Sequence, residues 1–288
     1  VGGVSLANVQ LLRLDLLNVE APGNKWFKLQ AYVAQARASG IQRLVSFGGA
    51  WSNHLHALAA VGAREGLATV GIVRGNDGGE LSATLRDCRD LGMSLEFVSR
   101  QEYRQRYETG YLASLADRFP GSIVIPEGGG DARGVTGSRQ IGRLLAAETD
   151  MPGRAVVAVG TGTTLAGMIA ELDSRWELIG VSALRVALDL DRRVADAVRA
   201  QLGGAATARW RIAHDYHCGG FARVSEGLKA FILDFEAVQG IALDPVYTAK
   251  ALFMVHSLRA SGAWEPDGPL TVVHTGGLQG RRGYDWLS

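Results

Sequence analysis

Short apolar runs alternate with longer amphipathic stretches from residue 43 onward, and glycine-rich turns separate them. The short runs are rich in β-branched residues and predict strands, whereas the longer stretches carry apolar residues at helical spacing and predict helices. The first predicted strands are Arg43–Gly48, Thr69–Arg74, Ser94–Ser99 and Ser122–Pro126. The helices predicted between them are Ser52–Glu65, Gly79–Leu91 and Gln101–Arg118. This alternation predicts a parallel sheet with helices on both faces.

A second series of the same kind follows. Its predicted strands are Arg154–Val159, Glu177–Ala183, Ala208–Ala213 and Leu270–His274, with helices after the first, second and third of them. Two predicted helices, Ser225–Val238 and Thr248–Arg259, fall between the last two strands. These strands predict a second parallel sheet.

The segment before residue 40 predicts an edge strand, Leu11–Asn18, and a helix, Lys25–Ser39. Because no neighbouring segment can pair with that strand, we assign it to the second sheet. The predicted fold is therefore α/β, with two open, twisted, mainly parallel sheets flanked by helices. A large domain comprises residues 1–39 and 134–288, and a small domain of residues 40–133 is inserted into it.

Composition excludes several classes of partner. The 30 basic and 29 acidic residues leave a net charge of +1 and form no basic run, so neither nucleic acid nor an anionic membrane surface is expected as a partner. No apolar stretch approaches the roughly 20 residues of a membrane span. Cys88 and Cys218 lack metal-ligand or disulfide spacing and predict free thiols. Together with a start at Val1 that shows no export signal, they favour the cytoplasm.

The segment Gly160-Thr161-Gly162-Thr163-Thr164 follows a predicted strand and opens a predicted helix. Backbone N–H groups at a helix start lack helical partners and carry partial positive charge, and glycine lets an anion approach them. The segment therefore predicts a phosphate site, with a purely structural glycine turn as the alternative. A dinucleotide-binding motif would have glycine or alanine at the position of Leu165, and a Walker nucleotide-binding motif would continue with Gly-Lys-Ser/Thr. Neither motif is therefore favoured.

Lys25 begins a predicted helix after Gly23 and Asn24. A helix start and partial burial beside Trp26 both disfavour the ammonium form of a lysine and expose a nucleophilic amine. The alternative is a solvated lysine at a helix start. The sequence contains three other lysines, Lys28, Lys229 and Lys250. We expect Lys28, on a neighbouring helix face, to contact phosphate or serve the structure.

The stretch Ser46–His54 is a third strand, glycine turn and helix start. Ser52 and Asn53 suit helix capping, and the same loop suits an α-carboxylate. Two anion sites and one reactive lysine match the needs of a phosphate-bearing aldehyde cofactor and an amino-acid substrate. No Gly-x-Ser-x-Gly elbow occurs, and the histidine spacing predicts no metal site.

Six ordered motifs resemble the 1-aminocyclopropane-1-carboxylate deaminase and D-cysteine desulfhydrase group, within the tryptophan-synthase-β-like (fold type II) pyridoxal-phosphate enzymes. The motifs are Gly23–Leu29, Ser46–His54, Ile125–Gly129, Thr161–Met168, Asp244–Lys250 and His274–Gly277. The resemblance covers nearly the whole chain. It implies pyridoxal 5′-phosphate as cofactor, a small amino acid as substrate, a homodimer, and a mobile small domain that closes over the substrate.

The resemblance also implies roles for individual residues. The candidate catalytic residues are Lys25, Ser52 and Tyr247. The candidate cofactor contacts are Lys25, Asn53, Thr161, Gly162, Thr163, Thr164, Tyr247 and Thr248. The candidate substrate contacts are Ser52, Asn53, His54, Phe221 and Thr275. Lys25 would bind the cofactor covalently, Asn53 would bond its phenolic oxygen, and Thr248 would face its ring nitrogen.

Two departures bear on the reaction. The cyclopropane deaminases have a glutamate where this chain has Thr248, and a second active-site tyrosine where it has Phe221. A hydroxyl leaves the ring nitrogen unprotonated and weakens the electron sink, which favours α,β-elimination over ring opening. We therefore expect a D-cysteine desulfhydrase-like lyase that forms pyruvate, ammonia and sulfide.

Several alternatives remain open at this point. Within the same enzyme class, the chain could be a cyclopropane deaminase or a deaminase of another small amino acid. From other classes, it could be a pyridoxal-phosphate-binding protein without turnover, or a nucleotide-binding protein that uses Gly160–Thr164.

Overall fold

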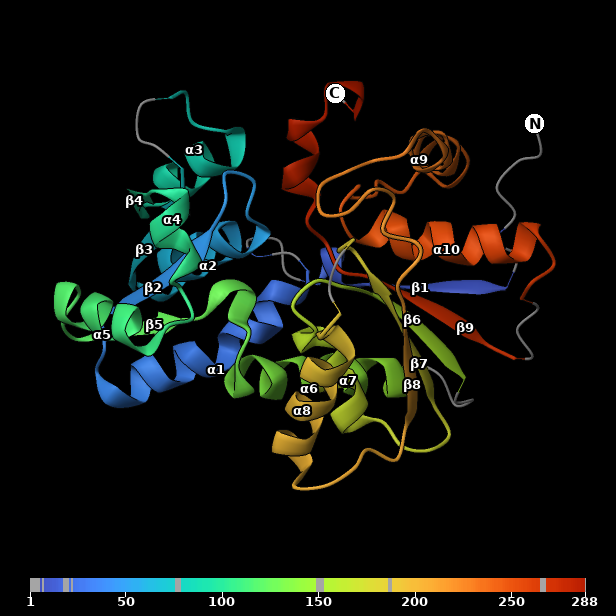
Figure 1. Cartoon of the computed structure of the whole chain (residues 1–288), viewed down its shortest axis with the longest axis horizontal. Coiled ribbons are helices and arrows are strands. Elements are labelled where there is room, and N and C mark those ends of the chain that lie inside the picture. The colour runs from blue at the N-terminus through green and yellow to red at the C-terminus, as the bar shows by residue number, and fades with distance from the viewer. Residues whose placement is uncertain are drawn as a thin grey trace.

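The computed structural model contains two parallel β-sheets with helices on their faces (Figure 1). It describes residues 6, 8–17, 21, 23–75, 79–148, 153–185, 188–264 and 268–287. Every strand pair within these ranges is parallel, so the predicted α/β class with two parallel sheets is confirmed. No helix in the described part of the chain is long and apolar enough to cross a membrane.

The larger sheet has five strands in the order β1-β9-β6-β7-β8. Their bounds are β1 Val9–Arg13, β9 Leu270–His274, β6 Arg154–Val159, β7 Glu177–Ser182 and β8 Arg209–Ala213. β1 pairs with β9, with Val9 opposite Leu270, which confirms that the first strand joins the second series. β1 begins two residues before the predicted Leu11 and ends at Arg13, because the chain turns into the 3-10 helix η1 (Leu14–Leu16), where the carbonyl of Leu14 accepts from the N–H of Gly23. The predicted end at Asn18 lies outside the described residues.

The smaller sheet has four strands in the order β4-β3-β2-β5. Their bounds are β2 Arg43–Gly48, β3 Ala68–Arg74, β4 Ser94–Val98 and β5 Ser122–Ile125. All of its strands lie within the proposed small domain, residues 40–133. The exact domain boundaries stay a prediction.

The α-helices are α1 Asn24–Ser39, α2 Asn53–Glu65, α3 Ala83–Asp90, α4 Arg100–Arg104, α5 Thr109–Arg118, α6 Ala132–Ala147, α7 Thr163–Glu171, α8 Leu190–Leu202, α9 Glu226–Gln239 and α10 Thr248–Ala260. Short 3-10 helices are η2 Glu127–Gly129, η3 Leu278–Gly283 and η4 Asp285–Leu287. Serine hydroxyls cap several of the helix starts. Ser52, Ser82 and Ser225 each accept the N–H three residues further along, as capping serines do.

Two helix predictions were inaccurate, and one helix was missed. The single helix predicted over Gln101–Arg118 is wrong, because the chain breaks between α4 and α5, where Arg106 bonds Glu127. The helix predicted from Gly79 begins at Ala83, after its serine cap. α6 was not predicted.

Alternate residues of the central strands face different helices. In β6, Val157 packs with α6, α7 and α8, whereas Val156 packs with α9 and α10. Figure 1 shows these two helix groups on opposite sides of the larger sheet. Both faces of the strand are therefore apolar, as expected for a parallel sheet.

Helix α1 packs into the cores of both sheets. Its Phe27 belongs to the core that α6–α8 form with the larger sheet, whereas Leu29 and Tyr32 belong to the core of the smaller sheet. The start of α1, with Lys25, therefore lies where the two sheets meet.

Candidate active site

The sequence-predicted motifs meet at the loops that follow β5 and β6. Gly128, after β5, adopts a φ of 69°, and a Cβ placed on it would lie 3.5 Å from Lys25 Nζ and 3.2 Å from Thr161 Cγ2. Thr161 follows β6, and Lys25 lies in the first turn of α1. Three motifs that are distant in sequence therefore converge on one small volume.

The approach of Gly23 to Thr275 fixes the position of Lys25. Gly23 has a φ of 93°, and a Cβ on it would lie 2.2 Å from the carbonyl oxygen of Thr275, so a glycine is required there. The N–H of Asn24 donates to the same oxygen at 3.1 Å. The loop after β9 thus holds the start of α1.

The amine of Lys25 is poised to react. Burial lowers its pKa to about 8, and a hydrogen bond with Lys28 and the charge of Glu127 partly oppose this shift. About half of the amines are therefore neutral, and hence nucleophilic, at pH 8.

Lys28 and His54 form a buried group beside Lys25. Lys28 is 2% exposed, and burial and the charge of Lys25 hold its pKa well below the usual range. His54 is 3% exposed, and burial together with Lys25 and Lys28 lowers its pKa. Ser46 Oγ donates to the carbonyl of Ile125 and lies 2.8 Å from His54 Nε2, so His54 is the donor to Ser46. The His54 ring is thus bonded inward, and its substrate contact stays a prediction.

The start of α7 suits a phosphate. Gly162 caps the helix with a φ of 91°, and Thr163 and Thr164 form its first turn. Thr163 Oγ1 lies 2.9 Å from Thr161 Oγ1, and Thr164 Oγ1 accepts from Asn24 Nδ2 at 2.8 Å. N–H groups and hydroxyls therefore gather at one helix start, directly beside the loop that carries Lys25.

The start of α2 faces the loop after β9. The amide oxygen of Asn53 accepts from Gln279 Nε2 at 2.6 Å. A Cβ on Gly277 would lie 2.3 Å from Asn53 Nδ2, which places the two loops in contact. Ser52 precedes Asn53 and caps α2 through Leu55 N. These contacts join the smaller sheet to the larger one.

Asp244 organises the start of α10. Its carboxylate accepts the N–H groups of Val246, Tyr247 and Thr248. Thr248 is fully buried, and its hydroxyl accepts the N–H of Thr275 at 3.2 Å. The candidate residues Thr248 and Thr275 are therefore directly bonded.

Tyr247 lies between the phosphate loop and Phe221. A Cβ on Gly160 would lie 3.2 Å from its Cε1, and its ring centroid is 6.2 Å from that of Phe221 at an angle of 65°. Burial and the charge of Asp244 raise its pKa, so the phenol stays protonated and can donate a hydrogen bond.

Glu127 is a charged group beside this site to which sequence reasoning assigned no role. Its carboxylate accepts from Tyr103 Oη at 2.7 Å, Arg106 Nε at 2.7 Å and Tyr107 Oη at 3.1 Å. Its charge acts on both Lys25 and Tyr247. Its place in the motif Ile125–Gly129, directly before Gly128, is the sequence feature that could have indicated a role.

The assembled residues fit pyridoxal phosphate. An amine with a lowered pKa suits its aldehyde, and the start of α7 suits its phosphate. Lys25 and Thr161 both border Gly128, so the two functions lie close together. Of the other candidates, Tyr247 approaches Gly160 of the loop after β6, whereas Asn53 contacts Gly277 and Gln279 after β9.

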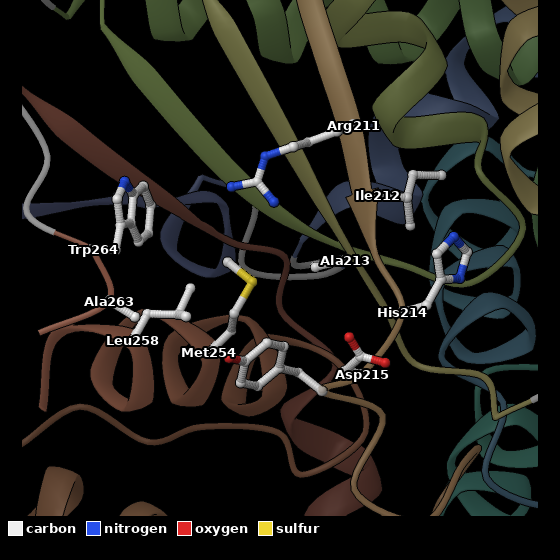
Figure 2. Close-up of a pocket in the computed structure, with 10 residues that line it drawn as sticks. Arg211, Ile212, Ala213, His214, Asp215, Met254, Leu258, Ala263 and Trp264 are labelled. Atoms are coloured by element: carbon white, nitrogen blue, oxygen red, sulfur yellow. The ribbon is translucent and has the colours of Figure 1, made fainter. Parts of the chain in front are cut away.

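A cavity of about 450 Å³ lies elsewhere, between β8 and α10 (Figure 2). Arg211 of β8 and Asp215 line it on one side, and Met254 and Leu258 of α10 line it on the other. None of the sequence-predicted site residues lines it.

Comparisons with known proteins give the family and the fold. The family model described as "Pyridoxal-phosphate dependent enzyme" matches residues 6–276. A D-cysteine desulfhydrase of Salmonella choleraesuis (strain SC-B67) is 31% identical over 285 residues, which cover 93% of this chain and 86% of that protein. The crystal structure of an ACC deaminase homologue superposes with a TM-score of 0.83 at 26% identity, covering 97% of this chain and 87% of that one. An O-acetylserine-dependent cystathionine β-synthase from Helicobacter pylori shares the fold, with a TM-score of 0.65 at 17% identity, over 95% and 89% of the two chains.

Proposed function

Because this chain belongs to the family of pyridoxal-phosphate dependent enzymes, we propose that it is a D-cysteine desulfhydrase-like lyase acting on a small amino acid. D-cysteine and water would give pyruvate, ammonia and hydrogen sulfide. The similarity to the D-cysteine desulfhydrase of Salmonella choleraesuis supports this substrate class.

The geometry around Gly128 supports two of the proposed cofactor contacts, those of Lys25 and Thr161. Lys25 would bind the cofactor through its amine, and Thr161, with Gly162, Thr163 and Thr164 at the start of α7, would hold the phosphate. Asn53 and Thr248 would orient the ring. When bound, pyridoxal phosphate supplies an aldehyde that condenses with amines and an electron sink for a carbanion.

The protein residues would guide the proton transfers. Lys25, which would hold the cofactor until the substrate binds, would then take the proton from the substrate α-carbon. Tyr247, whose phenol stays protonated, would donate a hydrogen bond to the departing thiolate as the carbon–sulfur bond breaks. Ser52, at the start of α2, would bind the substrate carboxylate, with Asn53 beside it.

Thr248 is the reason that we propose elimination rather than opening of a cyclopropane ring. Its hydroxyl bonds Thr275, and the neighbouring carboxylate of Asp244 is engaged by three backbone N–H groups. A neutral hydroxyl at this position would leave the ring nitrogen unprotonated, and the electron sink would be weak. A substrate that carries its own leaving group on the β-carbon suits such a site, and a cyclopropane ring does not.

A substrate panel tests this proposal. The purified protein with pyridoxal phosphate is given D-cysteine, L-cysteine, β-chloro-D-alanine, D-serine and 1-aminocyclopropane-1-carboxylate, and pyruvate and 2-oxobutyrate are measured. We expect pyruvate from D-cysteine and β-chloro-D-alanine, and little or no 2-oxobutyrate from the cyclopropane. Thr248→Glu should slow elimination, because a protonated ring nitrogen stabilises the carbanion that must expel the thiolate. Phe221→Tyr alone should change little.

The other outcomes separate the alternatives. Efficient 2-oxobutyrate formation would establish a cyclopropane deaminase, which the similarity to an ACC deaminase homologue makes the second candidate. Pyridoxal absorbance without turnover of any substrate would indicate a binding protein.

A further inference from the structure

The turn between β8 and α9 has an unusual backbone. Four of its residues have positive φ angles: Cys218 (50°), Gly219 (98°), Gly220 (111°) and Ala222 (55°). Cys218 and Ala222 are not glycine, so their left-handed conformation is unfavourable in isolation. Such a backbone persists only where its surroundings hold it.

Lys250 provides the main support for this turn. Its Nζ donates to the carbonyl of Gly220 at 2.7 Å, and the residue is fully buried. Tyr284 supports the turn from another side, because its hydroxyl donates to the carbonyl of Ala222 at 3.2 Å. Within the turn, Gly220 N donates to His217 O, and Arg223 N donates to Gly220 O.

The cavity between β8 and α10 lies beside this anchor. Met254, one turn beyond Lys250 on α10, lines the cavity together with Ala213 of β8 (Figure 2). Tyr216, in the segment that leads into the turn, lines it as well. The hydrogen bond from Lys250 ties the turn to the same helix.

The supported turn presents Phe221 to the candidate site. The Phe221 side chain is 53% exposed, and its ring meets the edge of Tyr247. Tyr247 caps α10, and Lys250 lies in the first turn of the same helix. The start of α10 therefore carries Tyr247 itself and, through Lys250, holds the turn that carries Phe221.

A buried ammonium needs a specific reason at this position. Burial lowers the pKa of Lys250 to about 8, which shows that the charged form is disfavoured there. A methionine would fill the same space without that penalty. What methionine cannot do is donate to the carbonyl of Gly220.

We propose that Lys250 is a positioning residue: with Tyr284, it holds the turn Cys218–Ala222 so that Phe221 limits the length of the substrate side chain. The role of Phe221 toward the substrate rests on the proposed function. The anchoring of the turn by Lys250 and Tyr284 is independent of that function.

The first test needs no activity. Lys250→Met, Tyr284→Phe and the control Lys229→Met, all loaded with pyridoxal phosphate, are treated with an arginine-specific protease, and cleavage after the exposed Arg223 is followed by mass spectrometry. Because a charge-assisted bond is lost, cleavage should accelerate roughly ten-fold or more in Lys250→Met, and less in Tyr284→Phe. Lys229 lies on α9 over Trp286, so its variant should match wild type.

The second test measures side-chain selectivity. In Lys250→Met, the KM for D-cysteine should rise more than kcat falls, and the relative kcat/KM for S-methyl-D-cysteine should increase. Phe221→Ala should show the same change, and the double variant should add little to it, because both substitutions remove one function.

The outcomes are distinct. Cleavage after Arg223 at the wild-type rate in both Lys250→Met and Tyr284→Phe would overturn the anchoring role; if Lys250→Met does not fold, Tyr284→Phe decides alone. A loosened turn with unchanged selectivity would overturn the role of Phe221. No turnover by wild type would refute the proposed function, and the protease result would still decide the anchoring role.

Discussion

At the residue scale, the ionisation of Lys25 makes the first prediction. With a pKa of about 8, its amine should add to pyridoxal phosphate at a rate that rises with pH and levels off above about pH 8. An ordinary lysine would gain rate up to about pH 10.4. The rate is followed by absorbance after cofactor is added to cofactor-free protein.

Two controls define that measurement. Nα-acetyl-lysine, treated in the same way, reports the ionisation of the cofactor itself. Lys25→Ala should form no borohydride-reducible adduct, and labelling of Lys28 or Lys250 in wild type would refute the assignment. A rate that parallels Nα-acetyl-lysine up to pH 10 would contradict the lowered pKa.

Gly128 gives a second prediction at this scale. An added methyl group would lie 3.5 Å from Lys25 Nζ and 3.2 Å from Thr161 Cγ2, in a backbone with a φ of 69°. Gly128→Ala should therefore weaken cofactor binding as well as stability. Gly66 is the matched control, because its φ is 68° and nothing lies within 4 Å of the added methyl.

Both variants should lose similar stability, about 1–2 kcal/mol from the left-handed backbone. Only Gly128→Ala should raise the Kd for pyridoxal phosphate, measured by titration of absorbance. Equal Kd values in the two variants would place the cofactor away from Gly128.

Residues with a local signal could be predicted from the sequence. Lys25 follows Gly23 and Asn24, and Thr163 opens a helix after a glycine turn, so the residues that indicate each role are neighbours in the sequence. The contacts of Glu127 could not be predicted in this way, because its partner Tyr103 lies in α4 and its partner Arg106 lies in the turn that follows α4. Only the folded structure brings these side chains together.

At the element scale, helix α6 shows why a glycine-rich helix escapes prediction. Gly134, Gly137 and Gly142 lower its helix propensity and resemble loop residues in the sequence. In the structure they allow close packing: a Cβ on Gly137 would lie 2.0 Å from the carbonyl oxygen of Phe27 in α1. The glycines that hide the helix are those that let it approach its neighbours.

Gly137→Ala should therefore destabilise the protein, by about 1–3 kcal/mol or more, as overpacking does. The control Gly110→Ala lies in α5 with nothing within 4 Å of the added methyl, and it should be neutral or stabilising by up to about 1 kcal/mol. Urea unfolding of the cofactor-free variants measures both changes. Equal stabilities would show that α1 and α6 can move apart at little cost.

At the scale of the whole molecule, buried lysines set a pH dependence of stability. Burial lowers the pKa values of Lys25 and Lys250 to about 8, and that of Lys28 falls further. Between about pH 8 and the unfolded value near 10.4, these three lysines bind more protons in the unfolded chain than in the folded one, so their contribution to the free energy of unfolding rises with pH. Burial raises the pKa values of Cys88 and of tyrosines such as Tyr32, and their contribution falls with pH in the same range. The lysine contribution is therefore measured as a difference between variants.

The difference in free energy of unfolding between wild type and Lys250→Met should rise with pH, because only the variant lacks this titrating amine, and the difference between wild type and Lys229→Met should stay constant. Urea unfolding of the three cofactor-free proteins at pH 8, 9 and 10 measures both differences. A difference between wild type and Lys250→Met that does not rise across the window would contradict the lowered pKa of Lys250.

The layout of the two sheets could be predicted from alternating strands and helices, and the strand at residue 9 was assigned to the right sheet because no neighbour could pair with it. The role of α1 could not be predicted in the same way. Its sequence is apolar enough to contact two cores, and only the structure shows that Phe27 serves one and Leu29 the other.

The pairing of β1 with β9 has a consequence for synthesis on the ribosome. Strands β2 to β5 lie within residues 43–125, so the smaller sheet has all of its strands early in translation. β1 must wait for β9, whose strand begins at Leu270, before it can take its place. Until then, the segment with Lys25 lacks the Thr275 carbonyl that holds it. We therefore expect nascent chains to bind cofactor only after β9 has emerged from the exit tunnel, late in translation.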